Sequence, residues 1–219
     1  MRKNRIWKAI IAMALVGTAC FGALSGLSAY FTDSDEKINT VTVGNVKTDL
    51  EEPGWEDVPE DDKQDITPNE MIQKDPEITN TGKNDAFVFA EVQIPVKNIV
   101  CVGEDGQKLP AAETELFSYE IQEGWIKIKE EDVGGNDEEK FRKYVYAYGS
   151  ETECMMLKPG ETTPPLFTDI TLVNAVEGQI DDATLEIPVK SYAIQAENAG
   201  DSKLPEDIYD MYMKQNQEG

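Results

Sequence analysis

Histidine is absent from the chain, and this absence limits the chemistry that its side chains can perform. Ser-His-Asp and Cys-His catalysis both need an imidazole base, and a zinc peptidase ordinarily takes histidine ligands. The acidic residues form no Asp-Thr-Gly or Asp-Ser-Gly signature. A carboxylate pair of the kind used in glycoside hydrolysis cannot be located from spacing alone. The sequence therefore favours a protein that is not an enzyme and that binds no cofactor.

Oxygen ligands are dense in residues 51–64, EEPGWEDVPEDDKQ, and such a segment could bind calcium weakly. The candidate ligands are Asp57, Glu60, Asp61 and Asp62. The EF-hand spacing of acidic positions around a central glycine is missing. A solvated acidic loop, pinned to the protein by Trp55, is the preferred interpretation, with no dedicated metal site.

The cysteines give a second candidate chemistry. Cys101 and Cys154 could form a disulfide if the chain is exported, and on the chain-entropy estimate the bridge would stabilise the fold by about 4 kcal/mol. Two separate thiols are the alternative. Cys20 lies in the apolar N-terminal run and lacks the preceding leucine that a lipid-modified cysteine requires.

Three tyrosines alternate in residues 141–148, FRKYVYAY, so that Tyr144, Tyr146 and Tyr148 share one face of a predicted strand. Together with residues 120–129 this segment predicts a long β-hairpin. An exposed tyrosine face can stack on sugars, but aromatic residues in a sheet more often pack half-buried. Packing is therefore the preferred interpretation.

These residues follow an apolar leader. Residues 9–27 carry no charge, are preceded by basic residues and are followed by the small residues Ser28 and Ala29, as in a secretory signal peptide of residues 1–29. The best cleavage sites lie after Ala29 or Tyr30. A retained membrane anchor is the alternative, because the run could just cross a bilayer. Both alternatives place the remaining chain outside the cell.

The exported part is strongly acidic. The whole chain carries a net charge of −23, and removal of a leader with four basic and no acidic residues leaves −27. Nucleic acids and anionic membranes would be repelled, so neither is expected as a partner. The exported residues are enough for one packed domain. Short apolar segments with dispersed Gly and Pro indicate an all-β fold.

The mature chain begins with a segment prone to form strands. Val41 and Val43 share one face of a predicted strand over residues 38–43, and a second strand is predicted over residues 46–50. Gly44 between them suits a bulge or bend. Residues 30–50 are therefore predicted to form an N-terminal strand segment, followed by a β domain over residues 51–200 and a tail or short helix over 201–219.

Further along the chain, residues 86–94, 166–173 and 183–196 predict strands, and residues 111–117 predict a short helix. An amphipathic helix is predicted to start at Pro205, because proline is favoured in a first helical turn.

Four segments together resemble the TasA and camelysin family of exported proteins of Gram-positive bacteria. They are AYFTDSDEKINTVTVGNVKTDLEEPGW, ITPNEMIQKDPEITNTGKNDAFVFAEVQIP, LKPGETTPPLFTDITL and VKSYAIQA. The resemblance covers nearly the whole chain, although the middle is less similar to the fibre-forming TasA itself.

The resemblance implies a jelly-roll β-sandwich with short helices in its loops, located in the extracellular matrix or at the cell surface. It also implies cleavage by a SipW-type signal peptidase and fibre formation, in which the N-terminal strand of one subunit completes the sheet of the next. The residues expected to act in assembly are Phe31, Ile38, Val41, Val43 and Gly44. The partner would be the protein itself, a related fibre protein or a matrix polysaccharide.

General physics agrees with such assembly, since an open sheet edge can accept an unpaired strand. Head-to-tail joining of this kind does not close and yields filaments. In the alternative arrangement, residues 38–43 fold back onto the sheet of their own chain. The alternative function is a monomeric surface module that binds sugar or protein.

Overall fold

The structure is a computed structural model that describes residues 45–64, 66–134, 140–181 and 183–216, all within the compact unit Gly44–Gly219. Outside the described residues lie the predicted signal peptide, the cleavage sites Ala29 and Tyr30, and the assembly residues Phe31, Ile38, Val41, Val43 and Gly44. No helix in the described ranges is both long and apolar enough to span a membrane.

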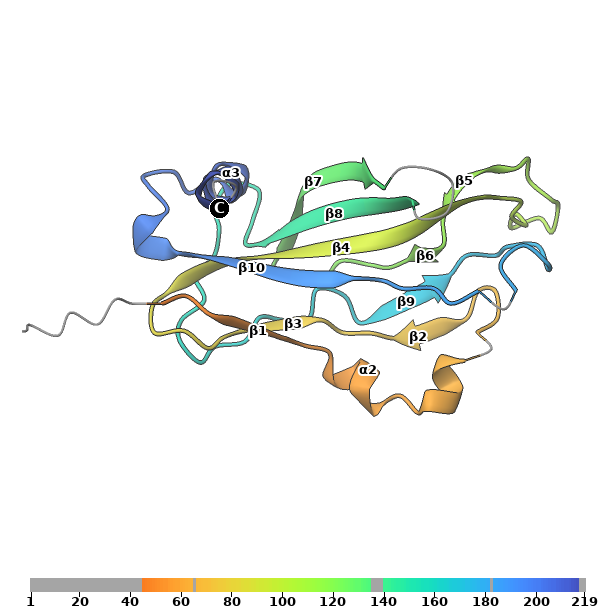
Figure 1. The fold of residues 1–219 in the computed structure, drawn as a ribbon, viewed down its shortest axis with the longest axis horizontal. Coiled ribbons are helices and arrows are strands. Elements are labelled where there is room, and N and C mark those ends of the chain that lie inside the picture. The colour runs from red at the N-terminus through yellow and green to blue at the C-terminus, as the bar shows by residue number, and fades with distance from the viewer. Residues whose placement is uncertain (1–44, 65, 135–139, 182, 217–219) are drawn as a thin grey trace, which may run out of the picture. The chain divides into compact units, whose positions relative to one another are not determined.

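The described residues are mostly strands with a few short helices, which confirms the predicted all-β class (Figure 1). The strands are β1 (Thr48–Glu51), β2 (Met71–Gln73), β3 (Glu77–Asn80), β4 (Ala86–Ile99), β5 (Ala112–Glu115), β6 (Phe117–Ser118), β7 (Trp125–Val133), β8 (Lys140–Tyr148), β9 (Asp169–Leu172) and β10 (Val189–Gln195). The α-helices are α2 (Pro53–Asp57) and α3 (Pro205–Asn216), with 3₁₀ turns at Glu60–Lys63 and Ala196–Asn198.

The strands form three antiparallel sheets. The largest has the order β10-β4-β8-β7, and β5 pairs with the C-terminal end of β4. A three-stranded sheet has the order β2-β9-β6, and β1 pairs with β3. The main core contains buried residues from all three sheets, so it lies between the largest sheet and the two smaller ones.

Strand β4 is the centre of the largest sheet and is buried on both faces. Val88 and Val92 point into the main core, whereas Phe87 and Phe89 belong to a second apolar cluster. Successive side chains of a strand point to opposite faces. A strand covered on both sides therefore needs the nearly continuous apolar sequence AFVFAEVQIPV.

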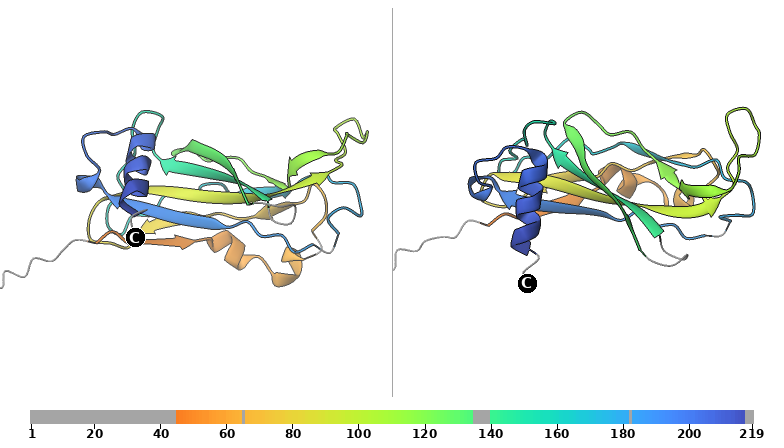
Figure 2. Two further views of the ribbon diagram at one scale, coloured as in Figure 1. Left: turned by 45° about the horizontal axis from the view of Figure 1, so that its top comes forward. Right: turned by 90° about the horizontal axis from the view of Figure 1, so that it is seen from above.

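Helix α3 covers the second cluster at the end of the sheet where β4 begins (Figure 2). Ile208 is fully buried against the sheet, and the rings of Tyr209 and Phe89 meet edge to face with centroids 5.3 Å apart. The helix predicted from Pro205 is present. Its apolar stripe has a definite partner, the outer face of β4, β8 and β10.

Two local predictions were wrong. Residues 111–117 form β5 and β6 rather than a helix, because Ala112–Glu115 pairs with Ile99–Val96 of β4 and this pairing overrides the helical tendency of the sequence. Residues 51–64 are not only loop, since they contain α2 and a 3₁₀ turn.

Candidate functional site: the seam between β1 and β10

The described chain begins with a segment that is paired to its own fold. In the β1–β3 ladder Thr48 lies opposite Asn80, and the pairing extends toward the N-terminus because the carbonyls of Asn45 and Lys47 accept hydrogen bonds from Lys83 and Thr81. Leu50 packs against the main core. The second half of the predicted N-terminal strand segment therefore pairs within its own chain.

Gly82 makes this pairing sterically feasible. A Cβ atom at this position would lie 2.6 Å from the carbonyl oxygen of Asn45 and 2.9 Å from the amide nitrogen of Lys47. Both neighbours are backbone atoms, which cannot move aside as a flexible side chain can. The start of β1 therefore depends on a glycine in the β3–β4 turn.

Beside β1 lies β10, and each is the last strand of its sheet on this side of the protein (Figure 1). The hydroxyls of Thr48 and Ser191 are 3.1 Å apart and hydrogen-bonded. In the described part of the chain, no backbone hydrogen bond joins β1 to residues 189–194 of β10. Among the described residues, the contact between the two layers at this point is therefore made by side chains.

Next to the Thr48–Ser191 contact the two edges separate around a surface pocket of about 300 Å³. Its lining residues are Leu50, Glu52, Trp55, Glu56, Lys74, Ile187 and Val189. Leu50, Ile187 and Val189 are partly buried and pack against the main core, so the pocket opens onto apolar surface. We call the facing residues Thr48, Leu50, Glu52, Ile187, Val189 and Ser191 the seam.

An ion pair closes one side of the pocket. The ammonium of Lys74 lies 2.6 Å from a carboxylate oxygen of Glu52, and both side chains are largely buried. The same ammonium lies 5.2 Å from the ring centroid of Trp55, and Lys63 lies 4.9 Å from it. A buried lysine is stable only when its charge is compensated, and here a carboxylate and an aromatic ring do so.

Helix α2 is fixed beside the pocket by Asp75, a residue that sequence reasoning did not single out. Its carboxylate accepts hydrogen bonds from the backbone amides of Gly54, at 2.8 Å, and Trp55, at 3.2 Å. These amides belong to the first turn of α2, where backbone donors lack partners within the helix. Asp75 thereby fixes the position of Trp55 against the protein.

The outer face of the β1–β3 ladder carries like charges. Glu51 lies directly opposite Glu77 in the register. Burial raises the pKa of Glu77, and the nearby carboxylates of Asp75 and Glu51 raise this pKa further. Directly opposed carboxylates weaken a strand pair. The charge pair therefore weakens the β1–β3 pairing at neutral pH.

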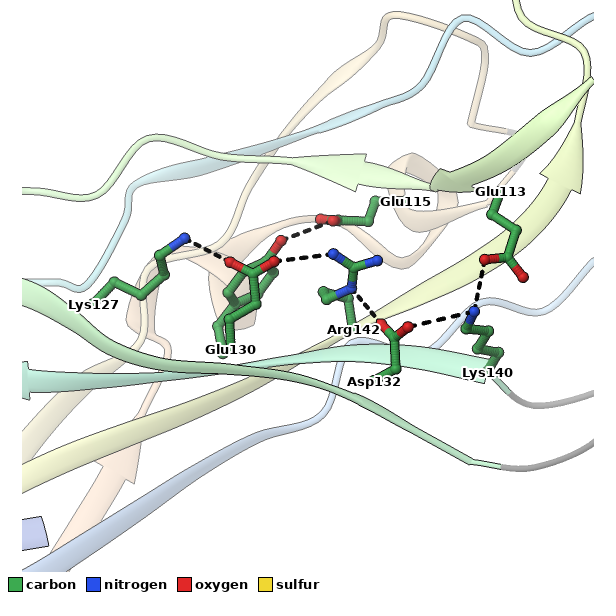
Figure 3. Close-up of polar contacts among 8 residues, drawn as sticks. Glu113, Glu115, Lys127, Glu130, Asp132, Lys140 and Arg142 are labelled. Atoms are coloured by element: carbon green, nitrogen blue, oxygen red, sulfur yellow. Dashed lines mark hydrogen bonds and ion pairs between the residues drawn. The ribbon is translucent and has the colours of Figure 1, made fainter. Parts of the chain in front are cut away.

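The opposite edge of the largest sheet, β7, differs in charge and regularity. Its pairing with β8 is interrupted by a bulge between Lys127 and Lys129. Figure 3 shows the ion pairs within this hairpin and the one that ties it to β5. Arg142 reaches Glu130 at 3.0 Å and Asp132 at 2.5 Å, and Lys140 reaches Glu113 at 2.7 Å.

Hydrogen bonds from Lys127 and Arg142 hold the pKa of Glu130 below its usual value. Glu130 therefore stays ionised over a wider pH range and keeps its ion pairs. Charged side chains and bulges are the usual means by which an exposed edge strand is kept from pairing with another chain.

One carboxylate, Glu91, is buried on the outer face of the largest sheet. It accepts hydrogen bonds from the Tyr192 hydroxyl at 2.9 Å and the Gln93 amide at 2.7 Å, and it lies 3.9 Å from the ammonium groups of Lys143 and Lys190. Its polar partners account for its burial. This cluster fixes β10 and β8 to β4, and Glu91 has a structural role in it.

The structure separates the two cysteines. Cys101 follows the C-terminal end of β4, whereas Cys154 packs with Phe87 near its start. About 3.3 Å of rise per residue puts them roughly 40 Å apart, far beyond disulfide reach. Both thiols are free, so the disulfide is wrong and two separate thiols are present. Burial raises the pKa of Cys154 to about 12, which leaves its thiol protonated and unreactive.

The tyrosine face of β8 is packing surface. Tyr146 is buried in the main core and its hydroxyl is 2.9 Å from that of Tyr119. Tyr148 packs on Trp125, and the Tyr144 hydroxyl donates to Glu115. Burial raises the pKa of Tyr146 to about 12. The preference for sheet packing over sugar stacking is confirmed.

The candidate calcium ligands lie in α2 and the following 3₁₀ turn. Asp57 and Glu60 are exposed, and Glu60 forms an ion pair with Lys63 at 2.8 Å. The side chains of Asp61 and Asp62 lie outside the described residues. In the described ranges, no three acidic or cysteine side chains form a group that could hold a metal ion. Weak calcium binding by this segment stays a prediction.

Comparison of the chain with models of known protein families gave no match, and neither did comparison with curated proteins or with solved structures.

Proposed function

We propose that the protein is a secreted structural subunit of an extracellular matrix fibre, or a protein associated with such a fibre, that assembles by exchange of its N-terminal strand. In this proposal a SipW-type signal peptidase removes residues 1–29 and the mature chain resides in the matrix or at the cell surface. Its β layers have the jelly-roll-like arrangement of the TasA and camelysin family, and it has no catalytic role.

The observation that carries the proposal is the unequal treatment of the two outer strands of the largest sheet. The β7 edge is charged and bulged, whereas β10 faces β1 across a seam whose pocket is lined by both apolar and charged side chains. An unprotected edge beside apolar surface favours the addition of a strand. Such an edge favours aggregation of a permanent monomer, whereas in a fibre subunit it allows assembly.

The alternative function, a monomeric module that binds sugar or protein, has less support. Its best residue evidence was the tyrosine face of β8, and Tyr146 of that face is 4% exposed. A ring this deeply buried cannot stack on a sugar. Matrix polysaccharide remains a proposed partner of the assembled fibre.

The proposal is tested by negative-stain electron microscopy of secreted protein that starts at Phe31, beside a version that starts at Gly44. Filaments from the longer version alone are expected, because only that version carries residues 31–43. The shorter version keeps all the described strands and serves as the folding control, checked by circular dichroism. Monomers in both preparations would contradict the proposal and favour the binding module.

A further inference from the structure

We propose that the pocket beside β1 and α2 binds a primary alkylammonium group, either the side chain of a lysine on a partner protein or a free alkylamine. The apolar part of the pocket would take the alkyl stem, and the carboxylates of Glu52 and Glu56 would take the ammonium. This inference goes beyond the proposed function, because it requires neither strand exchange nor a filament.

The pocket matches an alkyl stem in size and in lining. Its volume is about 300 Å³, at the lower end of the range of roughly 300–1,000 Å³ for small-molecule sites. Leu50, Ile187 and Val189 form its apolar part and are partly buried against the main core. An alkyl stem that covers these side chains removes apolar surface from water, which favours binding.

The charged lining of the pocket has an excess of negative charge, with Glu52 and Glu56 against Lys74. The backbone amide of Glu56 donates to the carbonyl of Glu52 at 2.9 Å, which is a helical contact between positions i and i+4. Side chains four positions apart lie on the same side of a helix. The two carboxylates are therefore neighbours along one wall of the pocket.

Lys74 leaves acceptors on these carboxylates for a second ammonium. Its own ammonium donates to Oε2 of Glu52 at 2.6 Å. Within the described ranges, no hydrogen bond or ion pair reaches Oε1 of Glu52 or the carboxylate of Glu56. An ionised carboxylate has about four lone-pair sites. An ammonium bound between the two residues can therefore donate to both.

The surroundings of the pocket already hold ammonium groups. Lys63 and Lys74 lie 4.9 and 5.2 Å from the ring centroid of Trp55, and an aromatic face attracts cations. Each of these lysines is paired with a carboxylate, so neither adds an uncompensated positive charge. A sugar would have to compete with these ammonium groups for the ring, so an alkylammonium fits the site better than a sugar.

The field of the whole protein acts in the same direction. The chain has a formal net charge of −23, and a strong excess of one sign raises the local concentration of oppositely charged ligands. A cationic ligand is therefore favoured over an anionic one before it reaches the pocket.

The experiment is calorimetric titration of the monomer fraction of the mature chain from Phe31. The first probe is N-acetyl-lysine methylamide, and its matched control is N-acetyl-norleucine methylamide, which keeps the alkyl stem and lacks the ammonium. The second probe is butylammonium, which lacks the peptide groups. Both lysine and butylammonium titrations are repeated with Glu56→Gln and with Glu177→Gln, which changes an exposed carboxylate outside the pocket lining. Circular dichroism verifies that both variants are folded.

The inference predicts saturable binding of the lysine probe, no measurable binding of the norleucine control, and about fivefold weaker binding to Glu56→Gln. Glu177→Gln should bind like the parent chain. Butylammonium that binds as tightly as the lysine probe would identify a free alkylamine as a sufficient ligand, and tighter binding of the lysine probe would identify a protein partner.

Three results would overturn the inference: no binding of either ammonium probe, equal binding of the lysine and norleucine probes, or an equal loss in both variants. The proposed function would stand after each of these results, because filament formation is measured separately by electron microscopy.

Discussion

The two outer strands of the largest sheet, β10 and β7, differ in the side chains and neighbouring strands that lie along their edges. In the described part of the chain, each is the last strand at its end of the sheet. On β7 the chain places a bulge and the exposed side chains of Lys127 and Lys129. Beside β10 lie the strand β1, a side-chain hydrogen bond to it and a pocket lined by both apolar and charged side chains.

Under the proposed function, we expect a partner strand to add at β10 rather than at β7. The cost of desolvating charged side chains opposes strand addition at β7. At the seam, a strand added beside β10 would cover the partly buried apolar side chains of Leu50, Ile187 and Val189. Substitutions can change the surroundings of β10 and of β7 separately.

The largest effect is expected on the seam side, from Gly82→Ala. The new Cβ would collide with backbone atoms of Asn45 and Lys47, and forced overpacking typically costs about 1–3 kcal/mol. Urea unfolding should show a loss of about 2 kcal/mol, and protection of the β1 amides in hydrogen exchange should fall.

Gly103→Ala is the matched control for this change. Its Cβ would meet the flexible Asp105 carboxylate at 3.2 Å, so the free energy of unfolding should stay nearly constant. Equal loss in both variants would show that the close approach at Gly82 does not hold β1.

A smaller effect is expected on the β7 side, from Arg142→Ala. This change removes the cation between Glu130 and Asp132, and partly exposed ion pairs contribute up to about 1 kcal/mol. The loss should shrink in 1 M salt, where such charges are screened. Lys158→Ala, which removes an exposed pair at 3.9 Å with Glu161, should change urea unfolding by less. A loss at Arg142 that does not respond to salt would mean that packing is responsible.

The sequence pattern predicted a helix or strand correctly where the structure of the segment depends mainly on local sequence. The apolar run of β4, the alternation of β8 and the proline at the start of α3 each predicted their element. Residues 111–117 were predicted wrongly because their strand state depends on β4, which contacts them from more distant sequence. Propensity in so short a segment gives way to tertiary pairing.

The seam could not be predicted, because its parts are far apart along the chain. Threonine and serine are common residue types, and the sequence around Thr48 does not indicate a contact with Ser191, which lies 143 positions away. Asp75 likewise fixes α2 from 20 positions away. A carboxylate that caps a helix from another loop leaves no spacing signal, unlike a capping residue within the helix itself. Of the predicted N-terminal strand segment, the strand over residues 46–50 corresponds to β1, Thr48–Glu51.

The most direct test of strand exchange is a disulfide between two different copies. Mature chains carrying Val41→Cys are mixed with chains carrying Val189→Cys, both with Cys101→Ser and Cys154→Ala, and dimers are scored on non-reducing gels. A second mixture replaces Val189→Cys with Lys129→Cys on the β7 edge. The account predicts abundant dimer in the first mixture and little in the second. Equal amounts in both mixtures, or dimers only with the β7 variant, would contradict it.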